Sequence, residues 1–247
     1  MKMENEVKGL VLRKSDYRDN DAILSVLSNE GKVSILARGI NKIKSKNAYG
    51  CQLFTYSRFY LLNEKRDSIN SLKNVECVNS YRRIREDLVK QSMTFVMMEV
   101  LDKMDNDDLT FTLDEVLEYL DCLIKYEDAY CVLSLFLASI ANQCGLNPNV
   151  DECALCGSSK GISAFSIQDG GFICENCYHI GYHRKMKPDE LLKIRAINKA
   201  KIEHLPQLMT LGLWNYDIIA TQLQLLNEYS GFNVKSAQFL ECLESVN

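Results

Sequence analysis

The sequence has no apolar run long enough to cross a lipid bilayer. Its longest apolar-rich segment runs from Cys131 to Ala141 and is interrupted by Ser134 and Ser139, which is about half the length that a spanning helix needs. The first residues contain early acids and lack the apolar core of a secretory signal. We therefore expect a cytoplasmic protein that makes no contact with a membrane.

The sequence also lacks the short motifs of common catalytic and nucleotide-binding sites. It contains no G-x-x-x-x-G-K-[ST], no G-x-G-x-x-G and no G-x-S-x-G. All three histidines (His179, His183 and His204) follow the C-x-x-C pairs of the chain, whereas a zinc deaminase has an H-x-E upstream of its P-C-x-x-C. No paired acids accompany the basic regions, which argues against a nuclease. We therefore expect a protein that is not an enzyme.

Ten cysteines stand out in a chain whose composition is otherwise that of an ordinary globular protein, with 47% apolar and 25% charged residues. Without a secretory signal, a disulfide framework is not expected. Four of the cysteines form two close pairs. We interpret the other six as small buried apolar residues: Cys51, Cys77, Cys122, Cys131, Cys144 and Cys242.

Charge is divided unequally along the chain. The net charge of −4 combines a basic N-terminal third with an acidic remainder. Residues 1–90 contain 18 Lys/Arg and 11 Asp/Glu, a net charge of +7, whereas residues 91–247 contain 11 and 22, a net charge of −11. The basic third is therefore the part of the chain in which contact with nucleic acid is expected first.

The first 80 residues contain five short segments that are typical of β-strands. Asn29-Glu30-Gly31 has the composition of a hairpin turn, and a loop over residues 39–50 breaks the series after the third strand. This pattern suits a small closed Greek-key barrel of the OB type, with another small barrel or a sandwich as the alternative. The expected strands are Val7 to Leu12, Ala22 to Leu27, Val33 to Ala37, Leu53 to Leu62 and Ile69 to Val78.

After residue 80 the spacing of apolar residues becomes helical. Thr112-Leu113-Asp114-Glu115 has the pattern of a capping box and predicts the start of a helix. We expect an α+β protein with an OB-fold domain over 1–80 and a helical domain over 81–247, which includes a zinc-binding insert at 149–183. Other helices are expected around Ile84 to Met104, over Ala129 to Cys144 ending at Gly145, and over Pro188 to His204, Trp214 to Tyr229 ending at Gly231, and Ser236 to Val246.

The two C-x-x-C pairs are the strongest chemical signal in the sequence. Two residues between the cysteines of a pair let one tight turn present two thiolates, and two such pairs complete the four soft ligands of tetrahedral zinc. The pairs are separated by 17 residues, and Gly170-Gly171 supplies a hairpin between them. We predict one Zn²⁺ ion bound by Cys153, Cys156, Cys174 and Cys177.

The predicted ion is structural. Four thiolates fill the coordination sphere and leave no position for a water molecule. An insert of this size has little core of its own, so the metal would supply its folding energy. Two alternatives remain open: His179 or His183 replaces one cysteine as a ligand, or the thiols hold no metal.

A loop of positive charge follows the third expected strand. Arg38, Lys42, Lys44 and Lys46 place four cations within nine residues that contain no acid, and Gly39 makes the loop flexible. A mobile cationic loop beside a barrel suits contact with phosphates. The alternative is a charged segment that is merely solvated.

In the fourth expected strand, aromatic residues occur at alternate positions. Phe54, Tyr56, Arg58 and Tyr60 are two residues apart and so share one face. Rings beside an arginine suit stacking on unpaired bases. We predict that Tyr56, Arg58 and Tyr60 bind DNA together with the basic loop, although this face could instead pack on the helical domain.

A second basic stretch lies at residues 184–201. It contains seven Lys/Arg and two Asp/Glu and begins directly after the cysteine-rich insert. The stretch could bind DNA or an acidic peptide. Its candidates for partner binding are Lys187, Arg195 and Lys199.

Over nearly its whole length the chain resembles one family, the bacterial recombination mediator RecO. Each matching motif is weak alone, but their order and spacing together are specific. The motifs are Gly9-Leu10-Val11-Leu12, Asp16-Tyr17, Asp21, Gly31, Ala37-Arg38-Gly39, Glu99, Leu101, Gly145-Leu146-x-Pro148, Cys153-x-x-Cys156-Gly157, Phe165-Ser166, Gly170-Gly171 and Cys174-x-x-Cys177.

The resemblance implies an OB domain, a helical domain with a zinc module, and a non-catalytic role in recombinational DNA repair at the nucleoid. That role is to bind and anneal single-stranded DNA and, with RecR, to load RecA onto DNA coated by single-strand binding protein. Members of the family bind the acidic C-terminal tail of that protein through the helical domain, and residues 184–201 are the candidate surface here. Binding of duplex DNA is left open. The alternative is a zinc-stabilised protein-interaction adaptor whose barrel binds no nucleic acid.

Overall fold

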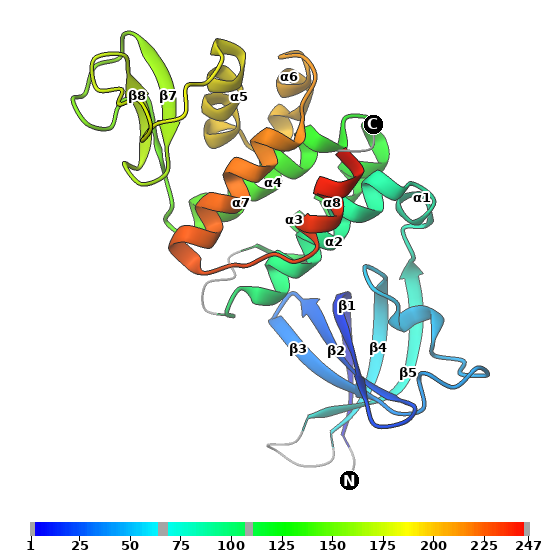
Figure 1. The fold of residues 1–247 in the computed structure, drawn as a ribbon. Coiled ribbons are helices and arrows are strands. Elements are labelled where there is room, and N and C mark those ends of the chain that lie inside the picture. Colours follow the sequence, from blue (N-terminus) through cyan, green and yellow to red (C-terminus); the bar gives the residue numbers. More distant parts are fainter. Residues whose placement is uncertain (1–2, 64–68, 107–110, 245–247) are drawn as a thin grey trace. The chain divides into compact units, whose positions relative to one another are not determined.

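The computed structural model describes residues 3–63, 69–106 and 111–244 (Figure 1). The chain packs as two compact units, Met1–Lys125 and Tyr126–Asn247. Within the described ranges, no helix is both long enough and apolar enough to cross a bilayer.

The first unit is built on a closed five-stranded barrel (Figure 1). The strand order is β1-β2-β3-β5-β4, and β1 closes the barrel by pairing with both β2 and β4, whereas β3 runs parallel to β5. The predicted OB-type barrel is confirmed, and each expected strand overlaps an observed one. The strands are β1 (Met3–Tyr17), β2 (Asp21–Ser28), β3 (Gly31–Ala37), β4 (Tyr56–Asn63) and β5 (Asn70–Asn79).

The barrel core comes mainly from alternate residues of the strands, because successive side chains of a strand point to opposite faces. Gly9 lies where β1 approaches β2 so closely that a Cβ there would be 2.6 Å from the Leu27 carbonyl oxygen. A larger residue would therefore push the two strands apart. The buried core residues are Val11, Ala22, Leu24, Val26, Ile35, Ala37, Ile40, Cys51, Phe59 and Leu61.

Three α-helices complete the described part of the first unit, and side chains tie the second of them to the barrel. The Arg13 guanidinium of β1 donates a 2.6 Å hydrogen bond to the Asp102 carboxylate, and the Lys32 ammonium of β3 donates to the Met104 carbonyl oxygen. These contacts explain why the barrel and the first helices pack as one unit, and the domain boundary at residue 80 stays a prediction. The helices are α1 (Arg82–Arg85), α2 (Leu88–Lys103) and α3 (Leu113–Lys125).

The second unit is a bundle around α4, which is buried on nearly all sides, as its apolar sequence predicts. α4 contacts α5, α6 and α7, and α8 packs on α7. The helix expected over Pro188 to His204 is shorter, because α5 ends at Lys199 and α6 begins separately. The helices are α4 (Ala129–Gln143), α5 (Pro188–Lys199), α6 (Leu205–Met209), α7 (Tyr216–Ser230) and α8 (Ala237–Glu244).

A three-stranded sheet lies beside α5 in the second unit (Figure 1). The first cysteine of each C-x-x-C pair is the last residue of one of its strands. The strand order is β6-β8-β7, and β7 and β8 form an antiparallel hairpin. The rings of Phe165 and Phe172 meet edge to face, with centroids 6.1 Å apart. The segment thus has a small apolar core, in keeping with the expectation that it has little. The strands are β6 (Asn149–Cys153), β7 (Ile162–Ser166) and β8 (Gly171–Cys174).

The helix caps and glycine positions predicted from the sequence are present. The Glu115 N–H donates to the Thr112 hydroxyl oxygen at 3.2 Å, and the Thr112 N–H donates to the Glu115 carboxylate at 2.8 Å, which is the predicted capping box. Gly145 and Gly231 have φ values of 74° and 67° and end α4 and α7. At Gly171 a Cβ would lie 2.3 Å from the Asn149 carbonyl oxygen, so the close approach of β6 to β8 requires a glycine there.

The six scattered cysteines differ in burial. Cys51 and Cys131 are buried, and burial raises the pKa of each thiol to about 12, which confirms for them the role of apolar core residues. The interpretation is wrong for Cys242, which is exposed, and only partly right for the half-buried Cys77, Cys122 and Cys144.

Candidate metal centre and nucleic-acid interface

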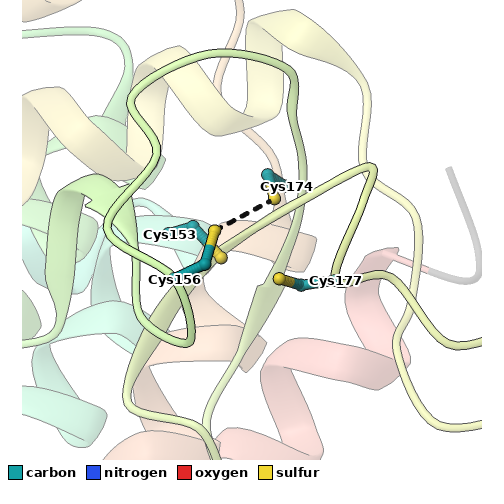
Figure 2. Close-up of side chains that lie close together, drawn as sticks. All are labelled: Cys153, Cys156, Cys174 and Cys177. Atoms are coloured by element: carbon teal, nitrogen blue, oxygen red, sulfur yellow. Dashed lines mark hydrogen bonds between the residues drawn. The ribbon is translucent and has the colours of Figure 1, made fainter.

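Four cysteine side chains point toward one another in the three-stranded sheet (Figure 2). Their sulfur atoms all lie within 4.8 Å of one another, and the Sγ atoms of Cys156 and Cys174 are 3.6 Å apart. Tetrahedral zinc with Zn–S distances of about 2.3 Å places its sulfur ligands about 3.8 Å apart. The cluster of Cys153, Cys156, Cys174 and Cys177 therefore has the donor type and spacing of a four-cysteine zinc site.

The sheet and two tight turns bring these cysteines together. Cys153 and Cys174 are the last residues of β6 and β8, and these strands are parallel neighbours, so the two cysteines lie at the same end of the sheet. A turn follows each of them: the Gly157 N–H donates to the Cys153 carbonyl at 2.8 Å, and the Cys177 N–H donates to the Cys174 carbonyl at 3.1 Å. Local spacing thus builds each pair, and the pairing of the strands unites the two pairs.

The cluster favours a thiolate at one position. Desolvation raises the pKa of Cys153, but hydrogen bonds from the backbone of Cys174, Leu155 and Cys156 outweigh it, so that the pKa falls to about 6. Hydrogen bonds with the Cys156 and Cys174 side chains raise the pKa of Cys177 to about 12. Because zinc binds thiolates, a bound ion would replace the protons that the sulfur atoms otherwise share.

The histidines after the cluster do not join it. The Nδ1 atom of the buried His183 accepts a 3.0 Å hydrogen bond from the His179 N–H, so Nε2 carries the proton and donates to the Asp169 carboxylate at 2.9 Å. Hydrogen bonds from the Ser166 hydroxyl and from His183 hold the pKa of Asp169 below its usual range. Both ring nitrogens of His183 are engaged, and among the described residues the ligand cluster contains cysteines alone.

The cationic loop holds its charged side chains in solvent. Arg38, Lys42, Lys44 and Lys46 are exposed, and none of them forms an ion pair with any residue in the described ranges. These four positive charges are therefore available to an anionic partner.

Hydrogen bonds shape this loop, which the sequence led us to expect as flexible. At its start the Gly39 N–H donates to the Asp21 carboxylate at 2.7 Å. Farther along, the Ser45 N–H donates to the Lys42 carbonyl at 2.9 Å and closes a tight turn. The loop therefore presents its cations from a defined backbone.

From Tyr56 onward, β4 alternates as the sequence predicts. Phe59 and Leu61 point into the barrel core, whereas Tyr56, Arg58 and Tyr60 are partly exposed on the outer face. The outer face thus presents two rings and a guanidinium group together.

Phe54 does not share that face, and this part of the prediction is wrong. It precedes β4 in a left-handed conformation with φ 45°, and its side chain is fully buried. Its ring packs on Phe95 with centroids 5.6 Å apart, and the Arg85 guanidinium lies 4.0 Å from its centre. The left-handed residue interrupts the alternation before the strand begins.

Acidic side chains of the neighbouring strands accompany the outer face of β4. The Tyr60 hydroxyl donates to the Glu76 carboxylate of β5 at 3.2 Å, and the Arg58 guanidinium lies 3.3 Å from the Glu6 carboxylate of β1. The hydrogen bond with Tyr60 and the charge of Glu6 raise the pKa of Arg58. This face therefore places its rings beside two acids and one arginine, whereas the charged residues of the loop are all cations.

One acid neutralises much of the basic stretch at 184–201. Asp151 of β6 accepts hydrogen bonds from Lys199 at 2.5 Å and from Arg195 at 2.7 Å, and these bonds lower the pKa of Asp151. Lys193 is buried and donates to the Leu213 carbonyl oxygen at 2.5 Å. The stretch is thus less positive at its surface than its composition indicates.

An apolar groove of about 450 Å³ borders the Asp151 pair. Arg195 lies at its edge, and Lys187 is exposed at the start of α5. Sequence reasoning missed both Asp151 and the groove; the only signal was the four-residue spacing of Arg195 and Lys199, which places both on one helix face. The apolar lining consists of Val150, Ile162, Phe172, Pro188, Leu191 and Leu192.

A closed OB-type barrel and a helical unit with a four-cysteine cluster that could hold a metal ion together place the chain among OB-fold proteins with an additional cysteine module. Residues 1–81 match the family model "Recombination protein O N terminal", and residues 85–207 match "Recombination protein O C terminal". The chain therefore belongs to the RecO family of DNA repair proteins.

Similar proteins match the chain over nearly its whole length. The DNA repair protein RecO of Bacillus pumilus (strain SAFR-032) is 30% identical over 243 residues, which cover 97% of this chain and 94% of the relative. That of Bacillus subtilis (strain 168) is 28% identical over 248 residues, covering 99% and 96%. That of Listeria monocytogenes serotype 4b (strain F2365) is 28% identical over 250 residues, covering 94% and 92%. The resemblance expected from the motifs is confirmed.

Proposed function

We propose that this chain is a non-catalytic DNA-binding protein of recombinational repair that acts at the nucleoid in the cytoplasm. It binds and anneals single-stranded DNA and, with RecR, helps to load RecA onto DNA coated by single-strand binding protein. The observation that carries this proposal is the loop at 38–46, in which four exposed cations, unpaired with any described residue, emerge from an OB-type barrel. Membership of the RecO family supports it.

The loop and the outer face of β4 would contact different parts of the strand. Cations that neutralise phosphates release condensed counterions, which adds affinity without reading sequence. The half-exposed rings of Tyr56 and Tyr60 offer faces on which bases stack. Glu6 and Glu76 beside these rings repel phosphates, so the sugar–phosphate backbone would follow the loop while the bases face β4.

A titration of the protein with single-stranded and duplex DNA at several salt concentrations tests the proposal. We expect binding at low salt whose logarithmic affinity falls linearly as the logarithm of the salt concentration rises. The comparison of the two DNA forms also measures strand preference. If neither form binds at low salt, the interaction adaptor becomes the better description of the protein.

We assign one structural zinc ion to the four cysteines. When bound, the ion would hold the ends of β6 and β8 together through Cys153 and Cys174 and fix the turns that present Cys156 and Cys177. Four protein ligands leave no position for a reacting water. Metal analysis of the purified protein should therefore find about one zinc per chain.

We further propose that α5 and the groove beside it receive the acidic C-terminal tail of single-strand binding protein. Carboxylates of the tail would take the place of Asp151 on Arg195 and Lys199, with Lys187 as a further cation. An apolar side chain of the tail would enter the adjacent groove. In this arrangement Asp151 competes with the partner for the same two cations.

Charge reversal tests the partner site. The double change Arg195→Glu and Lys199→Glu should weaken binding of a tail peptide far more than binding of bare DNA. The matched control is Arg184→Glu with Lys185→Glu, which changes the net charge equally at two exposed positions that do not line the groove. Equal losses for peptide and DNA in the first variant would indicate one shared surface instead.

A further inference from the structure

The basic loop contains one apolar side chain that packing does not explain. Ile43 lies between Lys42 and Lys44 and is fully exposed to solvent. The ends of the loop are anchored, because Ile40 and Cys51 belong to the barrel core. The exposure of Ile43 is therefore a property of the loop's shape and not of a loose end.

The turn dictates where this side chain points. The hydrogen bond from the Ser45 N–H to the Lys42 carbonyl makes Ile43 and Lys44 the two central residues of a β-turn. Central positions usually hold Gly, Asn, Asp or Pro, which suit the turn's dihedral angles. The turn does not require an isoleucine at this position, and it directs the side chain away from the barrel.

The surroundings of Ile43 indicate what it meets. The exposed Lys42, Lys44 and Lys46 are its neighbours in the loop. The two acids that reach the loop, Asp21 and Asp16, accept hydrogen bonds from the Gly39 N–H and the Asn41 side chain, ahead of the turn that presents Ile43. Single exposed apolar residues are common on protein surfaces, but this one stands among cations that are not paired within the described residues. A polyanion held by those lysines would lie against the isoleucine.

We propose that Ile43 is a wedge that enters the base stack of a DNA strand whose phosphates contact Lys42, Lys44 and Lys46. This inference rests on the proposed DNA-binding function of the loop. Apolar side chains of this kind separate adjacent bases in other DNA-binding proteins. Separating bases costs least when they are already unpaired. The wedge therefore also favours single strands over duplex.

A fluorescent base reports the wedge directly. 2-Aminopurine brightens when it is unstacked, so one analogue placed at successive positions of an oligonucleotide should brighten at one step when the protein binds. In Ile43→Ser we expect this signal to disappear and affinity for the single strand to fall about 5- to 10-fold, which is the lower range for one base-stacking side chain. Affinity for duplex should change less than about twofold, and the salt slope should not change, because no charge is removed.

Two further variants make the test specific. Ile43→Phe keeps a wedge and should retain the signal, and Leu213→Ser removes an equally conspicuous exposed apolar residue of the second unit and should behave as the unchanged protein. An unchanged 2-aminopurine signal and affinity in Ile43→Ser would overturn the wedge. If Ile43→Ser lost binding to phosphatidylserine–phosphatidylcholine vesicles and kept its DNA binding, the wedge would likewise be overturned in favour of a membrane contact.

The wedge and the proposed function fail in different ways. If the triple change of Lys42, Lys44 and Lys46 to Ala flattens the salt slope while Ile43→Ser has no effect, only the wedge is wrong. If neither variant affects DNA binding, the loop is not the DNA site and both are wrong.

Discussion

The loop at 38–46 and the helix α5 look alike as sequences and differ as surfaces. Both are rich in Lys and Arg, yet the cations of the loop have no ionic partner among the described residues, whereas Arg195 and Lys199 share the carboxylate of Asp151. Net charge along the chain therefore does not measure the charge that a partner meets. The difference assigns the two surfaces different roles: the loop suits a polyanion, and α5 suits a ligand that can displace one carboxylate.

Loss of the metal should have the largest effect, and it should act on one surface only. In Cys174→Ser we expect most of the zinc to be lost and the segment 149–183 to become sensitive to protease, because the proposed ion would hold the module together. Asp151 lies two residues before Cys153, so its pairing with α5 should loosen as well. Metal analysis and limited proteolysis measure these effects.

The first unit supplies the control for this variant. The barrel has its own core, so it should remain folded and keep its salt-dependent DNA binding. Full retention of zinc in Cys174→Ser would mean that the ligands are misassigned. Loss of DNA binding with an intact barrel would mean that the two surfaces are not independent.

The next effect concerns the loop. Each phosphate contact on single-stranded DNA contributes roughly 0.7 to the slope of log affinity against log salt, so changing Lys42, Lys44 and Lys46 to Ala should flatten the slope by about 2 units. At about 50 mM salt this corresponds to an affinity loss on the order of several hundredfold. Fluorescence anisotropy at a series of salt concentrations measures both quantities.

Charge-preserving changes sharpen this prediction. Replacing the same three lysines by Arg should leave the slope unchanged, because the number of cations is the same. The double change Arg195→Ala and Lys199→Ala should also leave it unchanged if α5 is not part of the DNA site. An unaltered slope in the triple-alanine variant would transfer the DNA site from the loop to another surface.

A smaller effect is expected on the outer face of β4. Tyr56→Ala or Tyr60→Ala should reduce the affinity for single strands by roughly 1–3 kcal/mol if the ring stacks on a base, with little change in the salt slope. Tyr60→Phe separates the ring from the hydroxyl that donates to Glu76. Tyr60→Phe should bind single strands like the unchanged protein. If it lost as much affinity as Tyr60→Ala, the hydroxyl and not ring stacking would be responsible.

The smallest effect should come from Asp151. Asp151→Asn removes the charge that competes for Arg195 and Lys199, so the affinity for an acidic tail peptide should rise about two- to fivefold, as befits an exposed ion pair. DNA binding should not change. Isothermal titration with the peptide measures the effect, and a weaker affinity would show that Asp151 orders the site instead of competing for it.

Sequence by itself determined the features whose causes are local. The four-cysteine cluster follows in part from the two-residue spacing inside each cysteine pair, and the capping box at Thr112 follows from residues three apart. The strands of the barrel follow from short segments rich in β-forming residues and bounded by turn residues, and alternation placed Tyr56, Arg58 and Tyr60 on one face. The alternating pattern gave the wrong face for Phe54, because this residue has a left-handed backbone conformation that turns the chain before the strand begins. A phenylalanine gives no sign of that conformation in the sequence.

Only the tertiary structure decided which charged side chains are paired with a carboxylate and which are open to a partner. Asp151 reaches Arg195 and Lys199 across 44 and 48 residues because β6 packs beside α5, and no local pattern encodes that contact. The exposure of Ile43 likewise depends on a turn whose ends are fixed in the barrel core. Spacing within a few residues is set by the geometry of the backbone and can be read from sequence, whereas the pairing of distant side chains is set by how whole elements pack.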